Sequence, residues 1–399
     1  MSPFTHLYTV IKKNSKVQEW LGILMIPALF YSTAITTFCL GAYLILAIPH
    51  FSKVKKWPKS LVAWPLIWLL VLFSGWNNQD SDLWQSNLFL KSPFLFMPFA
   101  FAALPKLSRR YIYDLHLWLL VVISITSIPI LINYIVNYSA IMQGLSQGQA
   151  IYMPIHHVLY SMIMSYAIIS NIYILLARKN INKAFRNVIT AAVIVLIVIQ
   201  HILAVRTGIV VLYLSFFILI LLLGKKSKDI IISFVMISLI GIASIKLIPS
   251  LKQRISYMQY DLEKFQKGEG RNYADSERIY SLQSGIQIWK SSPLLGVGYG
   301  DILDEMNMTG INKYPHSQFI FTLTGAGIIG LILLLAGLLI PYFNYKGELK
   351  GLLSLLYLNL FVCMTIDFVI EHSVIVAFLN LFGLSMICSE NMTDNLSES

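Results

Sequence analysis

Two arginines and a histidine are the side chains of this sequence best suited to chemistry on a phosphate. Arg206 lies in a short turn between two apolar segments, Arg278 lies in a long polar segment, and His316 follows that segment directly. A planar guanidinium binds two phosphate oxygens at once and stays charged. An imidazole can take a proton from a hydroxyl near neutral pH. Such a set could bind a diphosphate leaving group and activate an attacking hydroxyl without a metal ion.

The composition indicates that lipid is the main solvent of the elements that position these residues. The chain has 399 residues, of which 57% are hydrophobic and 12% charged, against about 45–50% and about 25% in soluble domains. Its three cysteines lie far apart in apolar runs, so no disulfide is indicated. We therefore predict an all-α polytopic membrane protein with a single transmembrane domain over residues 1–399.

A helix needs about 20 apolar residues to cross a bilayer core about 30 Å thick. The first apolar run is too long for one helix and contains Pro27, so we divide it into two. This division gives about twelve predicted spans. They occupy residues 18–31, 32–49, 61–76, 88–104, 111–136, 155–177, 185–204, 207–223, 229–248, 316–341, 351–370 and 373–388.

The positions of the charges predict the orientation. Lysine and arginine concentrate on cytoplasmic connections, and here they fill alternate connections, whereas the connections at 77–87 and 137–154 contain none. Both termini are therefore predicted to be cytoplasmic, with no cleavable signal at the start. The net charge of +11 then reflects topology and contact with anionic lipids rather than nucleic-acid binding.

The connection at 249–315 is by far the longest and is predicted to lie outside the membrane. An apolar repeat from Leu251 to Phe265 predicts an amphipathic helix. Asp275 is predicted to cap a second helix that runs to about Lys290, before Pro293. The glycine-rich run 296–300 that follows lacks the spacing of a dinucleotide-binding fingerprint, so it indicates a tight turn or close helix packing.

The predicted topology brings the chemically suited residues to one external surface. Asp367, Glu371 and His372 lie there too, at the external end of the last two predicted spans. Plainer roles stay open for each residue taken singly. An arginine at a helix end can extend to lipid headgroups, and a histidine can cap a helix. The adjacent His156 and His157 are interpreted as structural.

No metal site and no cofactor are predicted. The acidic residues at 301–305 have no histidine at ligand spacing, and the sequence contains no HExxH, CxxC, Walker or nucleophile-elbow motif. Nothing on the predicted cytoplasmic side is suited to a nucleotide. The two arginines and His316 together suggest glycosyl transfer from a polyprenyl diphosphate, in which the arginines bind the leaving group and His316 acts as general base.

The chain resembles the O-antigen ligase and O-antigen polymerase superfamily. The motifs that carry the resemblance are Arg206-Thr207-Gly208, the stretch 276–298 through Arg278 and the glycine turn, and His316-Ser317-Gln318-Phe319 leading into 325–331. Ser317 departs from the asparagine common at that position. The resemblance implies that Arg206 and Arg278 bind the donor diphosphate and that His316 is catalytic, with Asp367 or Glu371 as a possible supporting acid.

The resemblance also implies a substrate class and a location. The donor would be a glycan linked to undecaprenyl diphosphate, the acceptor the lipid A-core, and the site the periplasmic side of a bacterial inner membrane. Polymerisation of lipid-linked repeats and glycosylation of a protein hydroxyl stay open. A transporter of the lipid-linked glycan is the alternative of a different class, although transporters usually place polar groups near the midplane of repeated halves.

Overall fold

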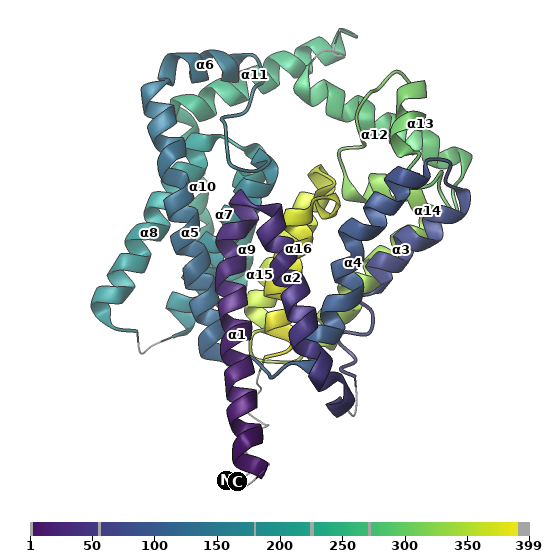
Figure 1. Ribbon diagram of the computed structural model, residues 1–399. Helices are drawn as coiled ribbons and strands as arrows, with labels where there is room; N and C mark the ends of the chain where they lie inside the picture. Colours follow the sequence, from purple (N-terminus) through teal and green to yellow (C-terminus); the bar gives the residue numbers. More distant parts are fainter. Residues whose placement is uncertain (1–2, 55–56, 179–180, 224–226, 270–272, 390–399) are drawn as a thin grey trace. The chain divides into compact units, whose positions relative to one another are not determined.

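The computed structural model describes residues 3–54, 57–178, 181–223, 227–269 and 273–389, and these form 16 α-helices (Figure 1). The only β-type contact among them is an isolated bridge between Leu107 and Ser389. The predicted all-α class is confirmed. The basic residues at 55–56, 179 and 225–226, on which the predicted orientation partly depends, lie outside the described residues.

Each predicted span overlaps one helix, although the helix at 66–74 covers only part of the span predicted at 61–76. These helices are α1 Pro3–Tyr31, α2 Thr33–Ala47, α3 Leu66–Ser74, α4 Ser81–Ala103, α5 Arg109–Val136, α7 His157–Ala177, α8 Lys183–Leu203, α9 Arg206–Leu223, α10 Ser227–Leu247, α14 Gln318–Asn344, α15 Lys350–Ile366 and α16 Ser373–Ile387. By length and composition, six segments within the described residues could cross a membrane, namely Thr33–Ser52, Arg109–Val136, His157–Ala177, Lys183–Leu203, Ile230–Leu247 and Gln318–Asn344. The count of twelve spans stays a prediction.

The first apolar run divides where the sequence predicts, but not at its proline. Pro27 lies inside α1, and the chain breaks at Ser32. Ser32 has an extended backbone, and its side chain accepts a hydrogen bond from the Ile35 amide at 3.2 Å. A serine in this role satisfies a backbone donor at a helix start, so Ser32 begins α2.

Two of the helices in the long connection match the prediction, and other short helices have no counterpart in it. The predicted amphipathic helix is α11 Pro249–Gln266, and the second is α12 Ala274–Ser291. The placement of residues 249–315 outside the membrane stays a prediction. The unpredicted short helices are α6 Tyr138–Ser146, α13 Ile302–Met308 and the 3₁₀ turns η1 Ile48–Lys53, η2 Gly75–Asn77 and η4 Val369–Glu371.

The chain divides into two compact units. Unit 1 comprises Met1–Trp118, Ser284–Leu353 and Phe368–Ser399, and unit 2 comprises Leu119–Gln283 and Ser354–Asp367. Within unit 1, α3 packs on α14, and α4 packs on α2, α3 and α16. Within unit 2, α7 packs on α8 and α9, and α6 lies beside α11. The single transmembrane domain stays a prediction.

The glycine-rich run of unit 1 closes against a kink in α14. Gly296 and Gly327 both have positive φ, at +71° and +63°. The amides of Val297 and Gly298 donate to the carbonyls of Thr324 and Gly325 at 2.9 and 3.0 Å. A Cβ on Gly296 would collide with the backbone at residues 325–326. The predicted tight turn is therefore confirmed, and it fixes the loop end to α14.

We expect Gly296→Ala to lower the stability of the protein more than Gly310→Ala. Both glycines have positive φ, which costs an alanine about 1 kcal/mol, but the space around Gly310 is open. At Gly296 the collision with backbone adds about 1–3 kcal/mol. Thermal unfolding of the two purified variants measures the difference, and equal melting temperatures would contradict the close contact.

Candidate functional site

Three arginines from three different helices line one pocket of unit 2. Arg206 is the first residue of α9, Arg254 lies on α11 and Arg278 lies on α12. His157, the first residue of α7, lines the same pocket. The remaining wall is Leu145, Ala150, Val158, Leu203, Ala204, Val205 and Thr207. The pocket therefore combines concentrated positive charge with a partly apolar wall.

The turn that carries Arg206 is held against α7. Ala204 ends α8 in the left-handed conformation, with φ at 51°. A Cβ on Gly208 would collide with the side chains of Gln200 and Ser161. Ser165 on α7 donates to the Gly208 carbonyl at 2.9 Å. The absence of a side chain at residue 208 thus lets α9 begin close to α7, and this places Arg206 at the pocket.

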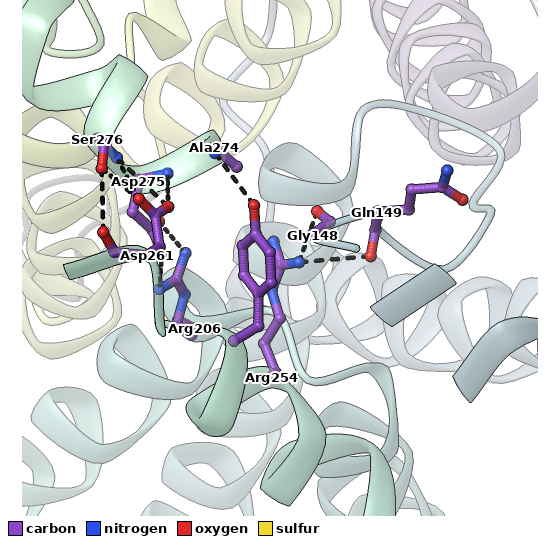
Figure 2. A network of polar contacts seen from close by, with 9 residues as sticks. Gly148, Gln149, Arg206, Arg254, Asp261, Ala274, Asp275 and Ser276 are labelled. Carbon is purple, nitrogen blue, oxygen red and sulfur yellow. Dashed lines mark hydrogen bonds and ion pairs between the residues drawn. The ribbon is translucent and has the colours of Figure 1, made fainter. Parts of the chain in front are cut away.

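Arg206 is paired with the first turn of α12 (Figure 2). Its Nη1 donates to Asp275 Oδ2 at 2.7 Å, and its Nη2 donates to Asp275 Oδ1, so the contact is bidentate. Both side chains keep about a fifth of their surface exposed, 23% for Arg206 and 21% for Asp275. The pair holds Arg206 in place, and an incoming anion would compete with Asp275 for it.

Asp275 lies in the first turn of α12 and not at its N-cap. The capping group is Asp261 of α11, which accepts from the amides of Asp275 at 2.6 Å and Ser276 at 3.3 Å. A carboxylate at a helix N-terminus accepts hydrogen bonds from the free backbone amides, and its negative charge interacts favourably with the helix dipole. Because Asp261 does this from another helix, the Asp275 carboxylate remains available to Arg206.

Arg278 is a mostly buried cation whose guanidinium is available to bind a ligand in the pocket. Burial lowers the pKa of Arg278 most, the nearby Asp367 carboxylate raises it, and repulsion from Arg206 lowers it again. In the part of the chain that the structure describes, its guanidinium makes no hydrogen bond and no ion pair within 4.0 Å. A group with this environment gains from binding an anion.

Asp367 belongs to the same unit as the arginines. It follows α15 and is buried, with 1% of its surface exposed. His156 Nδ1 lies 4.0 Å from its Oδ2. Its charge also acts on Arg278. Asp367 therefore offsets part of the positive charge of Arg278.

His316 lies in unit 1, immediately before Ser317 and the start of α14. Its side chain is partly exposed, and its ring centroid lies 5.9 Å from that of Phe368. Phe368 in turn stacks on Phe321 at 5.6 Å and on His372 at 5.6 Å. An aromatic cluster thus supports one side of the His316 ring.

Glu371, the other acid predicted near the site, is bound inside unit 1. Lys91 of α4 donates to its Oε2, and Gln318 donates to its Oε1 at 2.7 Å. Gln318 also accepts from the Ile370 amide at 2.9 Å. The Lys91 Nζ lies 4.9 Å from the ring centre of Tyr299. Glu371 therefore ties α4 to η4 and to the residues that follow His316.

We expect Lys91→Met to destabilise the protein by about 3 kcal/mol, because removing one partner of a buried ion pair leaves the other charge uncompensated. The side chains of Lys91 and Glu371 are only 1% and 6% exposed. The double variant Lys91→Met/Glu371→Gln removes both charges and should recover part of the loss. Thermal unfolding of the single and double variants tests this, and a double variant as unstable as Lys91→Met would contradict it.

One family model matches the segment of the chain that contains the three arginines of the pocket. Residues 191–335 match the O-antigen ligase family model. The superfamily resemblance read from the sequence is thereby confirmed. The segment that matches this model contains Arg206, Arg254, Arg278 and His316, and the match supports a membrane enzyme of the ligase and polymerase class. A search of curated proteins gave no match.

The structure brings together some of the predicted residues. Arg206 and Arg278 line one pocket of unit 2, whereas His316 and Glu371 belong to unit 1. Arg254 was not predicted as a site residue. It lies three residues after Leu251 and four before Met258, so it borders the apolar face of α11, and this position is the signal that could have identified it. Among the described residues no cluster of three His, Cys, Asp or Glu side chains could hold a metal ion.

Proposed function

We propose that this protein is a membrane glycosyltransferase that moves a glycan from undecaprenyl diphosphate to a lipid A-core acceptor. The observation that carries the proposal is the pocket whose three arginines all lie in the segment that matches the O-antigen ligase family model. A diphosphate presents several anionic oxygens, and arginine forks bind such oxygens bidentately. Arg278 and Arg206 bind the diphosphate in this proposal, and Arg206 exchanges Asp275 for the donor.

The proposed reaction is a displacement at the anomeric carbon of the donor glycan. The acceptor oxygen forms the new glycosidic bond while the bond from the anomeric carbon to the diphosphate oxygen breaks. The electron pair goes to the leaving diphosphate, where the arginines stabilise the charge. His316 takes the proton of the acceptor hydroxyl. The cations are side chains, so the proposal needs no metal ion and no cofactor.

The two acids have separate roles in this proposal. Asp367 compensates the charge of Arg278, since it lies in the same unit and acts on that arginine. Glu371 holds the segment that follows His316, because it accepts a hydrogen bond from Gln318, which lies two residues after His316. Asp367 is thus a positioning residue for the donor site and Glu371 one for the general base.

The first test is a lipopolysaccharide gel of a deletion strain complemented with wild-type protein or with His316→Ala. Bare core, with long glycan accumulating on undecaprenol, supports the ligase. Core capped by a single repeat indicates a polymerase instead. An unchanged ladder overturns both and indicates a protein or another surface acceptor. Full function of His316→Ala would favour a transporter that carries out no chemistry.

The proposed orientation places both termini in the cytoplasm of a bacterial cell and the site on the periplasmic face of the inner membrane. Single cysteines test it in a chain whose native Cys39, Cys363 and Cys388 are replaced by alanine. We expect a membrane-impermeant thiol reagent to label Lys267→Cys in intact spheroplasts and to leave Lys228→Cys unlabelled. Both side chains are exposed, so the reverse labelling pattern would show that the orientation in the membrane is opposite to the proposed one.

A further inference from the structure

Arg254 provides the third guanidinium of the pocket. Its side chain is only 8% exposed, although it lies on the amphipathic helix α11. It lines the pocket together with Arg206 and Arg278. A buried arginine beside two others is electrostatically costly unless something compensates it.

The protein compensates Arg254 only in part (Figure 2). Nη1 donates to the carbonyl oxygens of Gly148 at 2.6 Å and Gln149 at 3.4 Å. A guanidinium has five N–H donors, and the hydrogen bonds described for Arg254 use Nη1 alone. The contact therefore fixes the plane of the guanidinium against the loop at 147–150 and leaves Nη2 and Nε for other partners.

The charge balance of the pocket favours a multiply charged anion. Burial lowers the pKa of Arg254 most, and repulsion from Arg206 and Arg278 lowers it further, against an opposing effect of Asp275. Asp275 is already engaged in a bidentate pair with Arg206. A ligand that brings two or more negative charges would relieve the mutual repulsion of the three guanidinium groups.

We propose that Arg254 is a third diphosphate ligand, which makes this pocket selective for a polyprenyl diphosphate over the corresponding monophosphate. Arg254 binds the ligand with Nη2 and Nε while Nη1 stays on the Gly148 carbonyl. Two linked phosphates offer enough oxygens for three arginine forks, whereas a single phosphate does not. This inference rests on the proposed function of the pocket.

The test measures binding by the purified full-length protein in nanodiscs, with farnesyl diphosphate and farnesyl phosphate as soluble probes. The variants are Arg254→Gln and Arg254→Lys, and Lys252→Gln is the matched control. Lys252 lies on the same helix two residues away, is exposed and carries the same charge. Arg254→Lys retains the charge and a donor for the Gly148 carbonyl but loses the planar fork. Thermal unfolding of each variant reports whether it is folded.

We expect wild-type protein and Lys252→Gln to prefer the diphosphate. Arg254→Gln should weaken diphosphate binding about tenfold to a hundredfold, because hydrogen bonds to a charged group are lost, and should weaken monophosphate binding much less. Arg254→Lys should reduce the preference for the diphosphate over the monophosphate. Its melting temperature should equal that of the wild-type protein. An unchanged preference in a folded Arg254 variant overturns this inference alone, provided that Arg278→Ala still loses binding. Failure of the wild-type protein to bind either probe overturns the proposed function and this inference with it.

Discussion

His316→Ala should lower the turnover of glycan transfer by about 10²- to 10⁴-fold, the range that a positioned general base contributes. The acceptor hydroxyl would then have to lose its proton to water. The measurement is transfer by purified protein from undecaprenyl-diphosphate-linked glycan to a lipid A-core acceptor. Donor binding should change little, since the arginines that bind the donor are untouched in this variant.

His372→Ala is the matched control for that result. His372 stacks on the same Phe368 ring that lies beside His316, so its removal disturbs the aromatic cluster to a similar extent. We expect His372→Ala to retain transfer within several-fold of the wild type. If both histidine variants lost activity equally, the role of His316 would be packing. Retention of full transfer by His316→Ala would end its assignment as general base.

Arg278→Ala should lower kcat/KM for the donor by at least about 10²-fold. A bidentate contact to a phosphate consists of two charge-assisted hydrogen bonds, each worth about 1.5–3 kcal/mol. Arg278 is the pocket arginine without a bound partner among the described residues, so the ligand would be its main source of compensation. Transfer rates over a range of donor concentrations separate the effect on KM from the effect on kcat.

Two further variants make that result specific. Arg278→Lys retains the charge without the planar fork, so it should recover only part of the loss. Lys290→Ala, at the exposed end of the same helix, removes one positive charge and should leave the kinetics unchanged. A similar loss in Lys290→Ala would indicate a long-range effect of net charge. If only kcat fell, Arg278 would contribute to stabilisation of the leaving group and not to donor binding.

Local features of this fold could be predicted because they depend on local properties of the sequence. Apolar length decides where a helix can be buried in lipid, and each predicted span overlaps a helix. The break before residue 32 and the tight glycine turn at 296–298 depend on backbone conformation over a few residues. The superfamily motifs were recognisable for the same reason, because each occupies a short continuous stretch.

The tertiary structure decided which charges meet, because these partners are far apart in the chain. Asp261 of one helix caps the next, so Asp275 binds Arg206 instead of its own helix start. The pairing of Lys91 with Glu371 joins residues separated by 280 positions. Arg254 borders the apolar face of its amphipathic helix, but only the packing of α11 shows that it lines the same pocket as Arg206 and Arg278. The sequence determined the helices and the superfamily resemblance, whereas burial and long-range pairing determined which cations the pocket contains.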